Sequence, residues 1–150
     1  MKTTDRLNEV LKSARPDDIS KYLAEHEKNI LDNGAFSEYM RSKIREKDLT
    51  QQEVFLMADL SEKYGYKLIS GEKRTKQRDY ILRLCIAAGF SLDETNKALA
   101  LYGMSPLYAR IPRDAAIIVA LNNSINDVNA INDILKDNSF EELHQCRVPE

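Results

Sequence analysis

The sequence contains no tryptophan, only five glycines, four prolines and two cysteines among its 150 residues. So little glycine and proline excludes a collagen-like or low-complexity chain. The two cysteines are too few and too far apart for a disulfide framework, which favours a reducing compartment. No apolar run approaches the roughly 20 residues that span a bilayer, and the polar first residues do not resemble a signal peptide. We therefore expect a cytoplasmic protein that makes no membrane contact.

Residues that commonly carry catalysis or bind metals are also scarce. His26 lies in the charged stretch 25–28, which is typical of a solvated helix face. His144 is close to Cys146, but no second cluster completes the four ligands of a zinc site. Cys85 falls among apolar residues at helical spacing, so we expect a small core residue rather than a nucleophile. No phosphate-binding, zinc-protease or nucleophile-elbow motif occurs. We expect no enzyme, no cofactor and no metal.

The charge is unevenly distributed along the chain. The net charge is −2 overall, but residues 61–83 carry seven basic and three acidic side chains. The flanking regions 1–60 and 84–150 are both net acidic. A basic island of this kind indicates an anionic partner, although only weakly by itself.

Helical signals recur along the whole chain, and sustained alternation typical of strands is absent. Thr50 with Glu53, and Ser91 with Glu94, have the spacing of capping boxes. The expected helices lie around 7–11, 16–32, 36–47, 51–58, 62–70, 75–88, 92–102, 113–122 and 125–136, the last capped by Ser124, with a final turn starting at Ser139.

An internal echo runs through the second half. Arg-Asp at 78–79 recurs at 113–114, an offset of 35, and SLDETN at 91–96 resembles SINDVN at 124–129, an offset of 33. A duplicated helical hairpin explains the echo, and coincidence between short helices is the alternative. Two copies fall short of a solenoid.

Residues 49–74 form the most informative stretch, LTQQEVFLMADLSEKYGYKLISGEKR. The opening LTQQE, the cap at Ser61, the inward Leu68 and the exit GEKR resemble the helix-turn-helix of the lambda-repressor-like, Xre-type DNA-binding family. The segment ILRLCIAAGFSLD at 81–93 resembles the helix and turn that close that family's five-helix domain. The resemblance covers roughly residues 36–95.

The remainder resembles a narrower, Firmicutes-type group in which an Xre-like domain is continued by a helical hairpin. The similar segments are YGYKLISG, RD, ETN, PLY and RDAAII, beginning at 64, 78, 94, 106 and 113. The resemblance implies an all-α chain: an N-terminal helical arm over 1–34, a five-helix helix-turn-helix domain over 35–103, and a C-terminal hairpin extension over 104–150.

The sequence departs from the family at three positions. Asp59 stands where the family has glycine between the two helices, and aspartate can adopt a positive φ. Gly65 replaces an inward aliphatic residue of the recognition helix, at roughly 1 kcal/mol of helix propensity relative to alanine. Phe55 replaces a small alanine. Either Tyr64 or Tyr66 fills the space at Gly65, or the helix is loosened.

The resemblance implies sequence-specific binding of double-stranded DNA by a bacterial transcriptional regulator. A recognition helix enters the major groove and its first residues reach base edges, while neighbouring amides and cations hold phosphates. A homodimer through residues 104–145 or the N-terminal helices would match paired half-sites. The candidate DNA-binding residues are Gln51, Glu62, Lys63, Tyr66, Lys67, Lys73, Arg74 and Lys76.

A second function stays open, a protein-interaction adaptor on a degenerate helix-turn-helix scaffold. The sequence pI of about 5.8, Gly65 and Glu62 favour it. Any single lysine of the island could be only a solvated residue, and the equivalence of Arg78 with Arg113 favours a capping or ion-pair role for both. Carboxylates among the cations would favour the adaptor.

Overall fold

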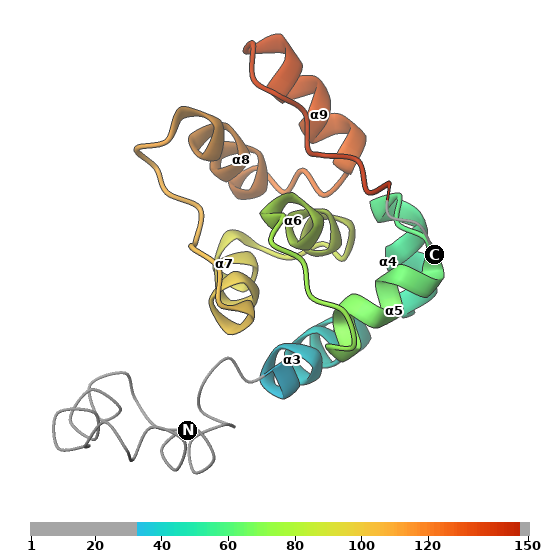
Figure 1. Ribbon diagram of the computed structural model, residues 1–150. Coiled ribbons are helices and arrows are strands. Elements are labelled where there is room, and N and C mark those ends of the chain that lie inside the picture. The colour runs from blue at the N-terminus through green and yellow to red at the C-terminus, as the bar shows by residue number, and fades with distance from the viewer. Residues whose placement is uncertain (1–32, 148–150) are drawn as a thin grey trace, which may run out of the picture. The chain divides into compact units, whose positions relative to one another are not determined.

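The structure, a computed structural model, describes residues 33–147, which form helices and no strand (Figure 1). The all-α prediction is confirmed for this part of the chain. Its helices are α3 (Asn33–Glu46), α4 (Gln51–Ala58), α5 (Glu62–Ser70), α6 (Arg78–Ala87), α7 (Leu92–Tyr102), α8 (Pro112–Asn122) and α9 (Val128–Asp137). The two predicted N-terminal helices and His26 lie outside the described residues. No described helix has the length and apolarity to cross a membrane.

Helix α6 is the centre of the fold. Every residue from 81 to 88 is buried, and α6 packs against α4, α7 and α9. Helix α3 closes one end of the core by packing on α5 and α7, and α8 and α9 lie at the other end (Figure 1). A helix that is apolar on every side can be stable only in such a position. Apart from Arg83, the sequence ILRLCIAA is apolar, and this places α6 inside.

Local sequence signals fix several helix ends as predicted. The side chains of Thr50 and Ser91 each accept a hydrogen bond from the backbone N–H three residues on. The glutamate at that position accepts one from the backbone N–H of the cap residue, so both capping boxes are confirmed. Ser61 caps α5 through the N–H of Tyr64 at 3.2 Å. Each satisfied cap contributes about 1 kcal/mol to its helix.

Four predicted ends are wrong. Helix α3 starts at Asn33 rather than about Phe36. Helix α6 starts at Arg78 rather than Thr75, because the side chain of Gln77 supplies its cap. Helix α9 is capped by Asp127, whose carboxylate accepts from two backbone N–H groups. Ser139 starts no helical turn, since it has a φ of 63° and ends α9. Residues 140–147, which we call the C-terminal strap, contain no helix.

Two reciprocal ion pairs join the α6–α7 hairpin to the α8–α9 hairpin. The guanidinium of Arg78 donates two hydrogen bonds to Asp114, and that of Arg113 donates two to Asp79. The Arg-Asp that opens α6 and the Arg-Asp that opens α8 therefore exchange partners. Contacts in which residue i meets j while j meets i characterise a two-fold relation. The internal echo corresponds to a structural repeat.

The segment after each hairpin is held by the same contact. Oδ1 of Asn96 accepts a hydrogen bond from the N–H of Leu107 at 2.9 Å, and Oδ1 of Asn132 accepts one from Leu143 at 2.8 Å. The two asparagines are 36 residues apart, and so are the two leucines, whereas the sequence comparison predicted an offset of 33. The smaller offset came from matching Ser124 to a cap, whereas Ser124 has a φ of 57° and lies in the turn.

A buried arginine attaches the C-terminal strap to the core. Arg83 is only 3% exposed, and it donates hydrogen bonds to the backbone oxygens of Ala58, Leu143 and His144 at 3.1, 2.8 and 2.7 Å. A buried charge must find such partners, because leaving it unpaired would cost several kcal/mol. The end of α4, the middle of α6 and the strap are joined at this one side chain.

Candidate nucleic-acid interface

Helices α4 and α5 form a hairpin with a three-residue turn. Asp59 ends α4 with a φ of 58°, as its place in a tight turn predicts, and the N–H of Leu60 reaches back to the oxygen of Phe55 at 3.0 Å. Gly71 ends α5 with a φ of 87°. The hairpin is fixed by its own backbone hydrogen bonds, so α5 presents a defined outer face.

Gly65 is the point of closest approach between the two helices. A Cβ added there would lie 2.5 Å from Cδ1 of Phe55, well inside van der Waals contact. Phe55 is 1% exposed, and its ring packs edge-on against Tyr66 with centroids 4.9 Å apart. The space left by Gly65 is therefore filled by Phe55, not by Tyr64 or Tyr66, and α5 is a continuous helix. The residues at positions 55 and 65 are therefore complementary in size.

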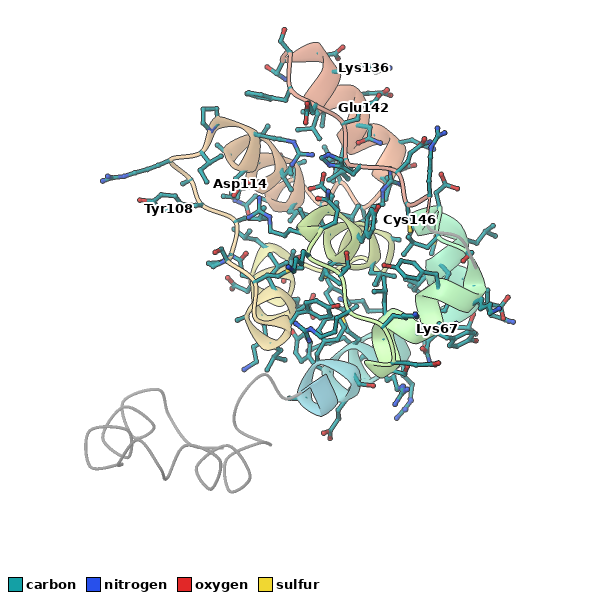
Figure 2. The ribbon with its side chains drawn as sticks, viewed as in Figure 1. Lys67, Tyr108, Asp114, Lys136, Glu142 and Cys146 are labelled. Carbon is teal, nitrogen blue, oxygen red and sulfur yellow. The ribbon has the colours of Figure 1, made fainter. Side chains whose placement is uncertain are left out.

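The outer face of α5 carries four of the candidate residues. Glu62, Lys63 and Tyr66 are exposed, and Lys67 is half-buried. Lys67 projects from α5 near α3 in Figure 2. Glu62 accepts a hydrogen bond from Nε2 of Gln52 at 2.7 Å, which links the first turns of α4 and α5. The structure thus places these residues on one helix face together with an exposed glutamine.

Gln51 lies differently from its neighbour Gln52. Gln51 is half-buried, and its Oε1 is buried without a hydrogen-bond partner, whereas Gln52 is exposed. The resemblance predicts Gln51, at the start of α4, as a candidate DNA-binding residue. On this helix Gln52 is the glutamine that reaches the outer surface.

The three predicted cations in the loop after α5 do not all point the same way. Lys73 and Lys76 are exposed in the loop, and Lys73 donates its backbone N–H to the oxygen of Lys67 at 3.1 Å. Arg74 turns toward α7, where its guanidinium lies 4.1 Å from the ring centroid of Tyr102 and donates to the backbone oxygen of that residue at 2.6 Å. Arg74 therefore braces the loop against α7.

Two further cations of the basic island point into the protein. Arg78 pairs with Asp114, as the repeat predicted, and Arg83 binds backbone oxygens. The cations of the island that remain at the surface are the exposed Lys63, Lys73, Arg74 and Lys76 and the half-buried Lys67, with Glu62 and Glu72 among them. The surface is thus less basic than the linear sequence suggests.

Sequence reasoning missed two arginines on α3. Arg41 and Arg45 are one helical turn apart, exposed, and line a hollow of about 580 Å³ that also includes Ser70 at the end of α5. Glu38 and Ser37 border the same hollow. The signal was the i, i+4 spacing of the two arginines on a helix with its apolar residues on the other side.

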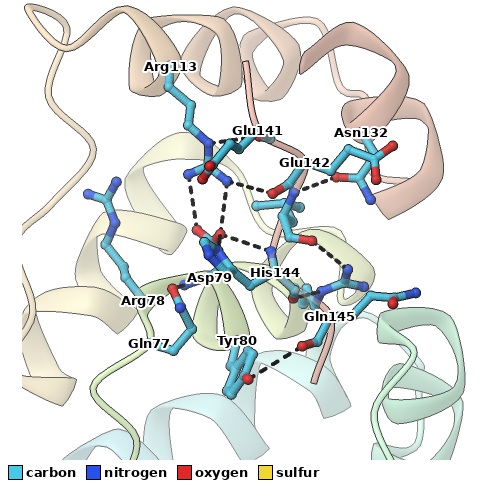
Figure 3. Close-up of polar contacts among 12 residues, drawn as sticks. Gln77, Arg78, Asp79, Tyr80, Arg113, Asn132, Glu141, Glu142, His144 and Gln145 are labelled. Carbon is cyan, nitrogen blue, oxygen red and sulfur yellow. Dashed lines mark hydrogen bonds and ion pairs between the residues drawn. The ribbon is translucent and has the colours of Figure 1, made fainter. Parts of the chain in front are cut away.

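Asp79 and Cys85 are two titratable groups held in structural surroundings. Asp79 accepts hydrogen bonds from Arg113 and from both the backbone N–H and Nδ1 of His144, the last at 2.6 Å (Figure 3). Burial alone would raise the pKa of Asp79, but these donors hold it below 3.8. Burial raises the pKa of Cys85, which lies in the core as predicted. No cluster that could hold a metal occurs between residues 33 and 147.

Apolar side chains border the outer face of the hairpin. Leu56 and Met57 on α4 are 81% and 47% exposed, and Tyr66 on α5 is 40% exposed. Exposed groups of this kind are typical of contact surfaces when they gather together.

The chain matches no protein-family model, no curated protein and no solved structure.

Proposed function

We propose that this chain binds double-stranded DNA, with α5 entering the major groove. The observation that carries the proposal is the outer face of α5, which presents Glu62, Lys63 and Tyr66 beside Gln52 of α4. A single α-helix fits the major groove of B-DNA, and its N-terminal residues reach base edges. The complementary fit of Phe55 and Gly65 supports the proposal because it keeps α5 rigidly positioned.

Each side chain on this face has a chemical role in such a complex. Lysine donates to O6 and N7 of guanine, glutamate accepts from N4 of cytosine, and glutamine pairs with adenine. Lys73 and Lys76 would follow the phosphate backbone, and Arg41 and Arg45 extend the cationic surface toward α3. Because phosphate contacts dominate affinity, these cations set the strength of binding and the α5 residues set its specificity.

The proposal includes the family to which the sequence is similar. A lambda-repressor-like, Xre-type helix-turn-helix would be formed by α4 and α5, and the chain would act as a bacterial transcriptional regulator in the cytoplasm. The described part supports this through the two short helices, the positive φ at Asp59 and the serine cap of α5.

Fluorescence anisotropy against mixed duplex DNA, from about 50 to 200 mM salt, tests the proposal. We expect the double variant Lys73→Ala/Lys76→Ala to weaken binding and to make the slope of log affinity against log salt shallower by about one for each lost phosphate contact. Lys97→Ala/Lys136→Ala, which removes two cations from α7 and α9, is the matched control. Absence of binding by the wild-type chain at the lowest salt would refute the proposal.

An adaptor function is the second candidate, and Leu56 favours it. An 81% exposed leucine beside the half-exposed Met57 suits a protein partner better than a phosphate backbone. Glu62 and Glu72 among the surface lysines point the same way. If the wild-type protein does not bind DNA, we expect Leu56→Asp to abolish binding of a protein partner in a pull-down and Lys63→Ala to leave that binding unchanged.

A further inference from the structure

The hollow beside α3 has no apolar side chain among the described residues that line it. Six of these residues recur at intervals of three and one, which places them on one side of α3, and the last residue of α5 completes the lining. A volume of about 580 Å³ suits a small molecule, and walls of this kind suit a polar one. We call this feature the α3 hollow: Gly34, Ser37, Glu38, Arg41, Ser42, Arg45 and Ser70.

The cations of α3 fall into two sets. Lys43 and Lys47 both pair with Glu94, at 3.4 and 3.0 Å. Arg41 and Arg45, in the α3 hollow, are exposed, and within residues 33–147 neither guanidinium has an ion pair or a hydrogen bond. Like charges at this spacing on a helix repel each other. The hollow therefore holds two cations that only a ligand or solvent ions can neutralise together.

The charge of the pair selects the chemistry of the ligand. The planar fork of a guanidinium matches two phosphate oxygens at once. A phosphate monoester carries about −1.5 to −2 charges at pH 7, so it can neutralise both Arg41 and Arg45, whereas a carboxylate or a phosphodiester carries one. Glu38 lies one turn before Arg41 and repels a phosphate from its end of the hollow. Its carboxylate can instead accept a hydrogen bond from a hydroxyl group of the ester.

Ser37 adds an independent observation in the same hollow. Its side chain is 6% exposed, and its Oγ is buried with no hydrogen-bond partner among the described residues. Buried polar groups are almost always paired, so an unpaired hydroxyl calls for a partner. A rotation about χ1 to another staggered position would bring this hydroxyl within reach of a phosphate oxygen held in the hollow.

We propose that the α3 hollow binds a small phosphate monoester that carries hydroxyl groups, with Arg41 and Arg45 on the phosphate and Glu38 on a hydroxyl. The binding chemistry is independent of the proposed function, and only one consequence rests on it. Because the two arginines extend the cationic surface for DNA, a bound ester would neutralise them and weaken DNA binding. The phosphodiester backbone of DNA is the other source of phosphate oxygens, and the experiment separates the two sources.

Isothermal titration calorimetry of the full chain with ribose 5-phosphate, at constant ionic strength, tests the proposal. We expect saturable binding with a dissociation constant below about 1 mM, and Arg41→Gln/Arg45→Gln to raise it at least about tenfold. Lys97→Gln/Arg110→Gln, which removes two exposed cations elsewhere, is the charge-matched control and should bind like the wild type. Ser37→Ala should weaken binding about two- to tenfold without lowering the melting temperature, because its hydroxyl has no partner to lose.

Two further probes separate the parts of the ligand. Ribose lacks the phosphate, and dimethyl phosphate is a diester with the single charge of a DNA phosphate, so both should bind at least about tenfold more weakly than ribose 5-phosphate. The inference is overturned by absence of ribose 5-phosphate binding at about 10 mM, by equal binding of dimethyl phosphate, or by unchanged binding in Arg41→Gln/Arg45→Gln. A wild-type chain that binds the ester but no duplex DNA refutes the proposed function and leaves this site in place.

Discussion

The α4–α5 hairpin and the two hairpins that follow it have the same architecture but place the charged residues at their helix starts differently. All three are pairs of short helices joined by a turn with a positive φ, at Asp59, Gly89 and Ser124. In the α6–α7 and α8–α9 hairpins, the arginine and aspartate that open α6 pair with the aspartate and arginine that open α8. In α4–α5 the charged residues at the helix starts lie outward. Charged residues at helix starts are therefore buried against a neighbouring hairpin in one region and stay at the surface in the other.

The largest expected effect comes from removing the buried cation that joins both regions. Arg83→Ala leaves three backbone oxygens without their donor, and each unsatisfied group costs about 1–3 kcal/mol. We expect the free energy of unfolding, measured in urea, to fall by at least about 3 kcal/mol. Arg110→Ala, at an exposed position in the α7–α8 connection, should change it by less than about 0.5 kcal/mol. Equal effects of the two variants would contradict the role given to Arg83.

The fit within α4–α5 is tested at its glycine. Gly→Ala in a helix normally stabilises by about 0.5–1 kcal/mol. Here the added methyl group meets the ring of Phe55, so we expect Gly65→Ala to destabilise by about 1–3 kcal/mol. Adding Phe55→Leu to that variant should recover part of the loss, and the double-mutant cycle measures the coupling. Additive effects would show that the two positions are independent.

The network of the second region is expected to respond to acid. Because the folded-state pKa of Asp79 lies below the unfolded value of 3.8, its stabilising contribution is complete above that value and is lost as pH falls through the folded pKa. Asp79→Asn should therefore flatten the decline of unfolding free energy below about pH 4. Asp93→Asn, at an exposed carboxylate, is the control. An unchanged acid limb in Asp79→Asn would count against the network.

The smallest expected effect concerns the equivalence of the two repeats. Asn96→Ala and Asn132→Ala each remove the acceptor of one backbone N–H, at about 1 kcal/mol apiece. We expect the two losses to agree within about 0.5 kcal/mol, measured by thermal or urea unfolding. A large difference would mean that the repeats share a backbone course but not their energetics.

The helices themselves could be predicted from the sequence, because caps and turns act over three or four residues. The boxes at Thr50 and Ser91 and the stops at Gly71 and Gly103 are local signals of this kind. The start of α9 was missed because two capping residues, Ser124 and Asp127, stand in the same turn, and only tertiary packing decides between them.

The candidate interface was predictable only in part, for a physical reason. The position of Lys63 and Tyr66 on the outer face follows from helical periodicity. The partners of Arg74 and Arg83 do not follow from periodicity, because they are supplied by α7 and by the C-terminal strap, far away in the sequence. The complementarity of Gly65 and Phe55 likewise requires knowing how closely α4 and α5 approach.

The attachment of the C-terminal strap has a consequence for synthesis on the ribosome. The backbone oxygens of Leu143 and His144 are ligands of Arg83, and the N–H of His144 is a donor to Asp79. Arg83 and Asp79 of the central helix therefore lack part of their hydrogen bonding until residues 143–144 have left the ribosome. A chain interrupted before that point would keep the α4–α5 hairpin on an unfinished core, which would be open to proteolysis.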